Sequence, residues 1–290
     1  MSKQVFSPIP CPPLHRGLPI NEFANWYTWS NEFLSFLLEA KAELDKLSTP
    51  PLIRLAYVKE KYNYTFSWPA DAWSGHRLSK LFDSFARSMP SSPTKIMLFD
   101  GLIGPALSSS QLHSLFAILR GTLAHLCGNE IFAMYAPLGN VGKWAGDAPL
   151  HADLYAPQYL FNVFDVVSSD DSGASIFLSF PMLRSLLAII RHLPAETADE
   201  ILALMSSNSL EDRFDELYDL LHGSHPWRSG LHRAMKQKQL RIKLRSGQGY
   251  LLSDRYWLHG REAVSGPVRK NRLHRLVYNA PEALNASIDG

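Results

Sequence analysis

The sequence has few cysteines, no surplus of charge of one sign and no long hydrophobic run, and each of these absences excludes a class of protein. Cys11 and Cys127 are its only two cysteines, which excludes a disulfide framework and an all-cysteine zinc site. Lys and Arg total 29 against 27 Asp and Glu, a balance too even to predict binding to nucleic acid or an acidic membrane surface. No apolar run reaches the roughly 18 residues of a membrane span, and the first residues do not resemble a signal peptide. We therefore expect a cytoplasmic protein whose partners include neither nucleic acid nor membrane.

The composition is that of a chain that folds around a sizeable core, because 46% of the residues are hydrophobic and 19% are charged. No linker or repeat divides the 290 residues, so we expect a single domain over 1–290. Five prolines in the first twenty residues predict an extended arm. Helical spacing then predicts helices at 21–47, 73–88 and 109–126, so that residues 1–130 form a helix-rich N-terminal part.

The second half of the chain has a different sequence pattern, in which short apolar runs alternate with residues typical of turns. This pattern is typical of a β-sandwich or barrel, and we expect it over residues 131–280. It is interrupted at 181–223 by apolar residues with helical spacing, which predict a helical insert. The predicted fold class is therefore α+β with a mostly β core, made of a barrel, a helical insert and a helix-rich N-terminal part.

His151 and Asp153 are the first candidates for chemistry. They lie two residues apart on a predicted strand, so their side chains point to the same face. One further histidine would complete a set of two histidines and one carboxylate, which binds Fe(II) and leaves three coordination positions open. With 11 histidines and 27 acidic residues, chance alone gives about one such pair. Taken alone, the pair favours a histidine that is simply hydrogen-bonded to its neighbour.

A longer pattern makes a metal site the better interpretation of this pair. About a hundred residues later comes Asp-Arg-x-x-Leu-His-Gly-Arg, which starts at Asp254 and contains His259 and Arg261. A Gly-x-Ser strand that ends in Ser175 lies between the two motifs, and Arg272 follows His259 by 13 residues. This order resembles the Fe(II)/2-oxoglutarate-dependent oxygenases, in particular the branch of taurine dioxygenase, clavaminate synthase and γ-butyrobetaine hydroxylase. The resemblance covers roughly residues 130–280 and implies a double-stranded β-helix, or jelly-roll.

The resemblance also implies the site. His151, Asp153 and His259 would hold Fe(II), Arg272 would bind the distal carboxylate of 2-oxoglutarate as a guanidinium fork, and Ser175 would hydrogen-bond the same carboxylate. O2 would be the second cosubstrate. The implied reaction is hydroxylation or desaturation of an aliphatic C–H of a small molecule, with release of succinate and CO2. Halogenation is not expected, because related halogenases lack the carboxylate that Asp153 supplies.

The residues themselves leave the identity of the cosubstrate arginine open. On a strand through 272–278, Arg272 and Arg275 point to opposite faces, so only one of them can face the barrel interior. The offset of 13 residues from His259 favours Arg272, and Arg275 is the alternative.

Residues that flank the iron ligands are the candidates for contact with substrate, because they usually line the mouth of such a barrel. The candidates are Tyr135, Asn140, Lys143, Trp144, Tyr155 and Arg261. Among them, Asn140 and Lys143 suit a carboxylate or amide, which points to an amino acid or an amino-acid-derived metabolite. The sequence leaves the substrate and the oligomeric state open.

Three alternatives stay open. The first is an oxygenase of peptides or proteins, which usually binds 2-oxoglutarate through a lysine on an earlier strand. The second is a cupin-like metal protein, which usually has more histidines in each motif. The third is a non-catalytic metal-binding jelly-roll module. Outside the motifs, His222, His225 and His232 are interpreted as partly exposed residues of a loop rather than as a second metal site.

Overall fold

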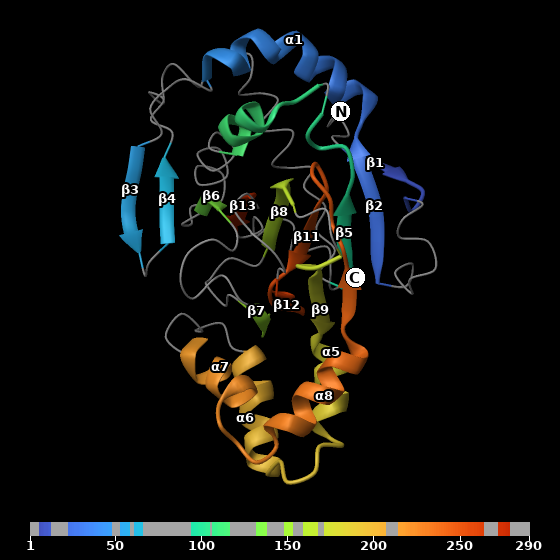
Figure 1. Ribbon diagram of the computed structural model, residues 1–290, viewed down its shortest axis with the longest axis vertical. Helices are drawn as coiled ribbons and strands as arrows, with labels where there is room; N and C mark the ends of the chain where they lie inside the picture. The colour runs from blue at the N-terminus through green and yellow to red at the C-terminus, as the bar shows by residue number, and fades with distance from the viewer. Residues whose placement is uncertain are drawn as a thin grey trace, which may run out of the picture.

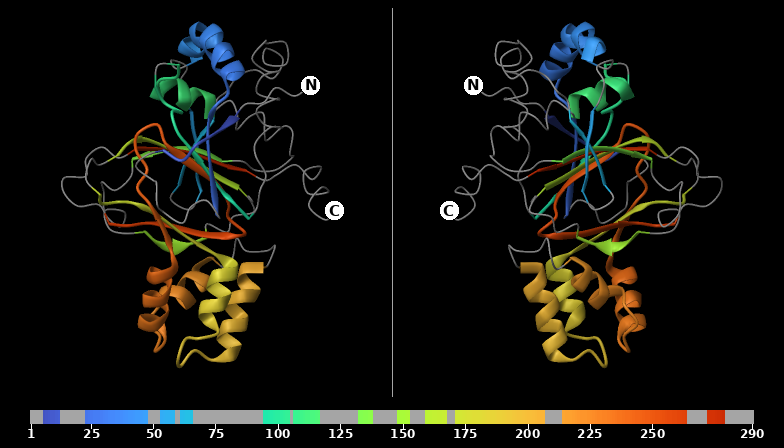
Figure 2. Two further views of the ribbon diagram at one scale, coloured as in Figure 1. Left: turned by 90° about the vertical axis from the view of Figure 1, so that its right-hand side faces the viewer. Right: turned by 90° about the vertical axis from the view of Figure 1, so that its left-hand side faces the viewer.

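The protein has four layers, namely helices, a large sheet, a smaller sheet and helices again (Figure 1). The computed structural model describes residues 6–12, 23–47, 53–58, 61–65, 94–104, 106–116, 132–137, 148–152, 159–167, 171–206, 214–263 and 272–278. Figure 2 shows the N-terminal helices beyond one sheet and the helices α5–α8 beyond the other. No helix among the described residues has the length and apolarity to cross a membrane.

The larger sheet has seven strands in the order β1-β2-β5-β11-β8-β13-β6. Its strands are β1 (Phe6–Ile9), β2 (Ala24–Trp29), β5 (Ile96–Phe99), β6 (Phe132–Pro137), β8 (Tyr159–Val166), β11 (Gly249–Ser253) and β13 (Arg272–Tyr278). All neighbours are antiparallel except β2 and β5, which are parallel.

The smaller sheet has four strands in the order β10-β9-β12-β7. These are β7 (Ala148–His151), β9 (Ser175–Ser179), β10 (Leu240–Ile242) and β12 (Trp257–Arg261), all antiparallel to their neighbours. From β6 onward, the chain therefore passes back and forth between the two sheets. A separate antiparallel pair is formed by β3 (Ile53–Val58) and β4 (Lys61–Thr65).

A hydrophobic core fills the space between the two sheets. Strand alternation sends every second residue of each strand into this space. The buried residues of the core are Ala24, Trp26, Ile96, Leu98, Leu160, Phe164, Phe177, Ile242, Leu244, Tyr250, Leu252, Trp257 and Leu273. Phe177 of β9 and Tyr250 of β11 meet edge to face across the gap, with ring centroids 4.9 Å apart. This dry interior is the environment into which the candidate site residues project.

The other face of the large sheet is covered by N-terminal helices. These are α1 (Asn31–Leu47) and the helical residues 109–116. Aromatic rings make the contact, because Trp29 stacks on Phe33 of α1 and Phe161 of β8 stacks on Phe116.

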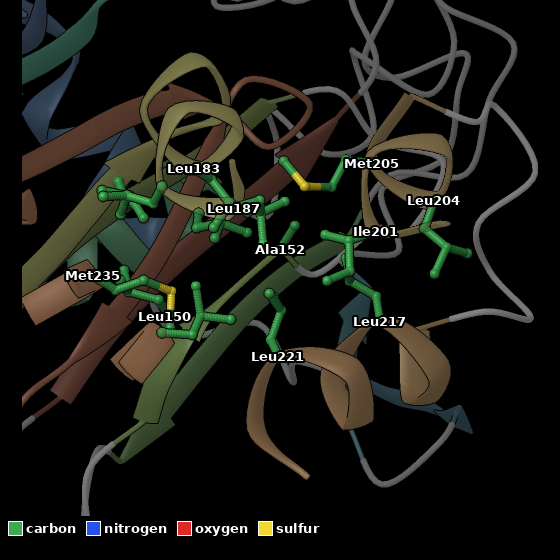
Figure 3. Packing of buried hydrophobic residues seen from close by; sticks show 14 of the residues in the cluster. Leu150, Ala152, Leu183, Leu187, Ile201, Leu204, Met205, Leu217, Leu221 and Met235 are labelled. Atoms are coloured by element: carbon green, nitrogen blue, oxygen red, sulfur yellow. The ribbon is translucent and has the colours of Figure 1, made fainter. Parts of the chain in front are cut away.

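Four helices cover the outer face of the small sheet (Figure 3). They are α5 (Phe180–Leu187), α6 (Ala195–Ser206), α7 (Phe214–His222) and α8 (Arg228–Lys238). Helix α5 follows β9 directly, because the Ser179 hydroxyl accepts a hydrogen bond from the Met182 N–H and Pro181 fits the first turn. The apolar faces of these helices pack on Leu150, Ala152, Ile176, Leu178 and Leu258 of the sheet.

The predicted α+β class and the mostly antiparallel β core agree with this architecture. The predicted β region begins with β6, and the predicted arm is extended at 6–12. The prediction was wrong in detail at residues 24–29, which form β2 rather than the start of a helix, and the N-terminal part contributes three strands to the sheet. The insert is longer than 181–223, since α8 extends it to residue 238. The predicted helix at 73–88 lies outside the described residues.

Candidate metal centre

His151 and His259 face each other across two paired strands. They occupy directly opposed positions of β7 and β12, and their ring centroids are 4.6 Å apart. Their neighbours Leu150, Ala152 and Leu258 pack outward against the helical insert. Strand alternation therefore turns both imidazoles inward, toward the space between the sheets.

The proton of His151 is fixed by its own strand. Its Nδ1 atom lies 2.7 Å from the carbonyl oxygen of Pro149. A carbonyl oxygen only accepts hydrogen bonds, so Nδ1 carries the proton in the neutral imidazole. The lone pair is then on Nε2, which is the arrangement of a metal-binding histidine whose other nitrogen donates to a carbonyl.

For His259, a buried carboxylate lies beside Nδ1. The Nδ1 atom of His259 lies 3.2 Å from Oδ1 of Asp254, and the two side chains are only 3% and 4% exposed. A carboxylate beside Nδ1 favours the proton on that nitrogen and leaves the Nε2 lone pair to a metal ion. Asp254 was recognised in the sequence only as the first residue of the motif that contains His259, and no part in metal binding was predicted for it. The signal was its spacing of five residues from His259, across the short turn between β11 and β12.

The separation of the two rings fits a shared metal ion. An ion about 2.1 Å from an imidazole nitrogen lies about 3.3 Å from the ring centre, so two imidazoles at adjacent octahedral positions have centres about 4.6 Å apart. The two rings have this separation, and they come from strands that the sheet holds in register. Two imidazole rings at this separation are compatible with a divalent ion such as Fe(II), which accepts imidazole ligands readily.

The third predicted ligand, Asp153, lies outside the described residues. Within the parts of the chain that the structure describes, no three His, Cys, Asp or Glu side chains form a group that could hold a metal ion. The two histidines are thus the described part of the predicted ligand set, and Asp153 stays a prediction.

Ser175 and Arg261 lie beside the histidine pair in the small sheet. Ser175 of β9 is opposite Arg261 of β12 in the strand register, and Ser175 is 3% exposed. Ser175 alternates with the outward-facing Ile176, so its side chain shares the inner face of β9 with Phe177. The residue after Arg261 is anchored, because Arg241 donates from Nε to both carboxylate oxygens of Glu262, at 2.8 and 2.9 Å.

Of the two candidate arginines, Arg275 projects between the sheets. It lies on β13 opposite Asn162 of β8, and its Nε donates to Oδ1 of Asn162 at 2.9 Å. Leu273 shares the face of Arg275 and belongs to the core between the sheets. His274 lies on the opposite face, where its ring is 6.1 Å from that of Phe116.

Arg272 is the first residue of β13, and its side chain lies outside the described part of the chain. The strand register shifts between Arg272 and Leu273, so simple alternation does not carry across that step. Asn162, a fully buried polar residue of the inter-sheet face, was missed by the sequence analysis because it stands within an apolar run.

Most residues predicted to contact substrate lie outside the described part of the chain. Tyr135 lies on β6 opposite His274, with its side chain outside the described part. Asn140, Lys143, Trp144 and Tyr155 are outside the described residues altogether. These assignments stay predictions.

Comparison with known proteins finds likeness only among solved structures, because no family model and no curated protein matches the chain. An asparagine oxygenase in complex with Fe(II), 3-hydroxyasparagine and succinate is 11% identical, with 90% of this chain and 95% of that chain covered and a TM-score of 0.47. The non-heme iron oxygenase OrfP, in complex with Fe, is 12% identical, with coverage of 91% and 96% and a TM-score of 0.44. PvcB from Pseudomonas aeruginosa is 13% identical, with coverage of 98% and 94% and a TM-score of 0.42.

A second structure of PvcB is described as that of an Fe- and α-ketoglutarate-dependent oxygenase, the class that the sequence motifs resemble.

Proposed function

We propose that the protein is an Fe(II)- and 2-oxoglutarate-dependent dioxygenase that hydroxylates or desaturates an aliphatic C–H of a small molecule. The observation that carries the proposal is the pair of inward-facing histidines, His151 and His259, whose Nδ1 atoms lie beside the Pro149 carbonyl and the Asp254 carboxylate. The arrangement leaves both Nε2 atoms suited to one metal ion at the edge of a dry core. Asp153, two residues after His151, would complete the ligand set and offset charge on the dication.

The strand order supports a jelly-roll as the fold that carries this site. The strands β6, β8, β11 and β13 lie in one sheet, and β7, β9, β10 and β12 lie in the other. In this arrangement the ligands at 151 and 259 come from neighbouring strands of the small sheet, although more than a hundred residues separate them in sequence.

The second part of the proposal concerns 2-oxoglutarate. Arg275 is our choice for the distal carboxylate, with Arg272 as the alternative, because Arg275 lies on the inner face and is oriented by Asn162. A guanidinium has five N–H donors in a fixed fork, so the bond to Asn162 uses one and sets the plane of the rest. Ser175 on the facing sheet would add a hydroxyl donor.

Fe(II), once bound with 2-oxoglutarate and O2, would supply the oxidising power that no protein side chain has. The chain would supply the rest. The histidines and Asp153 would leave open positions on one side of the metal, Arg275 and Ser175 would orient the cosubstrate, and Phe177, Trp257 and Tyr250 would keep water out of the interior.

The proposed substrate is an amino acid or an amino-acid-derived metabolite, because Asn140 and Lys143 shortly precede the first ligand in the sequence and suit a carboxylate or amide. The experiment is a screen for succinate formation from 2-oxoglutarate with Fe(II), in which amino acids and small metabolites are added one at a time. We expect one class of compound to stimulate succinate release well above the rate without substrate. Failure of the whole panel, together with no binding of Fe(II) by the protein, would contradict the proposal.

Asp153 provides a sharper test of the ligand set. Asp153→Ala is expected to reduce iron retention strongly and to abolish substrate oxidation, since two neutral histidines would remain around a dication. Chloride should not raise the turnover of the unaltered protein, and no chlorinated product should form. Iron content after gel filtration measures iron retention, and mass spectrometry of the products measures oxidation and chlorination. Undiminished oxidation by Asp153→Ala would remove the facial ligand set.

A further inference from the structure

The outer face of β7 rests on the helical insert. Leu150 and Ala152, which flank His151, are buried among apolar side chains of α5–α8, as Figure 3 shows. His222, the last residue of α7, reaches the same strand with a polar contact. Its Nε2 atom lies 2.7 Å from the carbonyl oxygen of Leu150, and the residue is 9% exposed.

This finding corrects the interpretation of His222 and His232 as residues of one loop, whereas His225 does lie in a loop and is partly exposed. His222 ends α7 and His232 lies within α8, and their Nδ1 and Nε2 atoms are 2.9 Å apart. His225 lies away from the strand, stacked on Trp227 with ring centroids 4.6 Å apart and hydrogen-bonded to Asp219. The described residues form no second metal site.

The proton positions of this pair follow from its acceptors. The Leu150 carbonyl only accepts, so Nε2 of His222 donates. Nδ1 of neutral His222 then accepts, and Nε2 of His232 donates to it while lying 3.2 Å from the Leu221 carbonyl oxygen. Burial is the largest cause that lowers the pKa of His222 to about 4, so the neutral form that this arrangement needs is present at neutral pH.

Strand β7 has few backbone partners among the described strands. It is four residues long and lies at the edge of the small sheet among the described strands. Its only partner there is β12, and the register between them shifts between His259 and Arg261. The carbonyl of Leu150 belongs to the peptide unit that leads into His151. A rotation of that peptide plane would turn the Cα–Cβ bond of His151 and move its imidazole.

We propose that His222 is a positioning residue for the metal centre, which holds the Leu150–His151 peptide through its Nε2–H and so fixes the direction of the His151 imidazole. This inference rests on the proposed function. It assigns the insert a part in metal binding, because α7 and α8 together present the hydrogen-bond donor to β7.

The test compares variants of the full-length protein in their affinity for Co(II), measured by titration of its visible absorption without cosubstrate. His222→Phe keeps a ring of similar size but has no donor for Leu150. Loss of a partner that orients a metal ligand costs about 10–100-fold in metal affinity, and we expect a loss in that range. His225→Phe is the matched control, because it also exchanges a histidine of the insert for a ring but has no contact with β7. We expect it to bind Co(II) like the unaltered protein.

A second pair of variants separates positioning from packing. His222→Gln places an amide N–H close to the position of Nε2, whereas the shorter side chain of His222→Asn does not reach Leu150. We expect near-normal Co(II) affinity for His222→Gln and reduced Co(II) affinity for His222→Asn. This comparison holds even if His222→Phe does not fold. Thermal unfolding of the metal-free variants supplies the readout of stability alone, and a purely structural role would lower it without separating Gln from Asn in metal affinity.

The outcomes distinguish the two proposals. If the unaltered protein binds Co(II) and His222→Phe and His222→Asn bind it equally well, the positioning role is wrong and the proposed function stands. If the unaltered protein binds neither Co(II) nor Fe(II), the proposed function fails and the positioning role fails with it.

Discussion

The two facing histidines depend on which of their nitrogens carries the proton. In His151 the Pro149 carbonyl decides this, and in His259 the neighbouring Asp254 carboxylate does. An imidazole with the proton on Nε2 would present N–H to the metal position and could not coordinate. The partners of Nδ1 are therefore as important to the site as the ligands are.

Asp254→Asn tests this dependence. The amide keeps the size of the side chain but can direct its NH2 group at Nδ1, which would favour the wrong tautomer of His259. We expect metal affinity to fall about 10–100-fold. Titration with Co(II) measures it, and Asp171→Asn is the control, since Asp171 is 79% exposed and pairs with Arg241 away from the histidines. Equal affinity in the two variants would count against a role for Asp254.

Single substitutions also distinguish the two arginines proposed to bind the distal carboxylate of 2-oxoglutarate. Arg275→Ala is expected to raise the KM for 2-oxoglutarate about 30-fold or more, because truncation leaves the distal carboxylate buried without its partner, a loss of about 2–5 kcal/mol. Ser175→Ala should cost about 1 kcal/mol, since one hydroxyl hydrogen bond is lost. Uncoupled or substrate-stimulated succinate formation gives the KM. A silent Arg275→Ala beside a damaging Arg272→Ala would reverse the assignment.

Among the elements, the pairing of β7 with β12 depends on one glycine. Gly260 lies between His259 and Arg261, and a Cβ atom there would be 2.5 Å from the carbonyl oxygen of Ala148 and 3.0 Å from Pro149. These are backbone atoms of β7, so they cannot move without moving the strand. The glycine of the His-Gly-Arg motif thus permits the close approach on which the opposed histidines depend.

Gly260→Ala is expected to push β7 away from β12. Overpacking of this kind costs about 1–3 kcal/mol of unfolding free energy, and the shift of His151 should weaken Co(II) binding as well. Gly230→Ala is the control. A Cβ at Gly230 of α8 meets only Ile190 Cγ2 at 3.8 Å, so alanine should stabilise the helix by about 0.5–1 kcal/mol. Urea unfolding measures both, and a neutral Gly260→Ala would contradict the steric argument.

The elements also show what the sequence could and could not predict. The strands of the second half were recognisable because apolar residues alternate or run between turn signals, as in β9 and β12. Strand β2 was mistaken for the start of a helix because Phe23 and Trp26 are three residues apart, a helical spacing that the true helix α1 continues through Phe33 and Leu37. Helix α8 was missed because it buries only Leu231 and Met235 and is otherwise basic.

In the site, the two histidines were predictable because a fixed spacing and a motif mark them. Arg275 was ranked second and Asn162 was not singled out. The face that each presents depends on the pairing of β13 with β8, two strands that are far apart in sequence. His222 could not be assigned to β7 for the same reason, since its partner Leu150 is 72 residues away.

For the whole molecule, buried neutral histidines connect stability to pH. Burial lowers the pKa of His113 and of His222 from 6.5 to about 4, and the nearby His274 adds to the shift at His113. The unfolded chain binds protons at these sites below about pH 6.5, whereas the folded chain does not do so until about pH 4. Stability should therefore be full above pH 6.5 and fall as the pH drops toward 4.

Urea unfolding at pH 7 and pH 5 tests this expectation. Each histidine should contribute a slope of no more than about 1.4 kcal/mol per pH unit. His113→Gln should make the fall between the two pH values shallower, whereas His225→Gln, on a more exposed histidine, should not. Equal stability at pH 5 and pH 7 would contradict the assignment of the buried histidines as neutral.

The position of β13 has a consequence for how the protein is made. This strand, the last described element of the chain, lies in the interior of the large sheet, hydrogen-bonded to β6 on one side and β8 on the other. While the chain is being synthesised, both neighbours present unpaired edges until residue 278 has left the ribosome. The large sheet therefore cannot close before β13 has emerged, and until then the strands made earlier expose edges that favour aggregation.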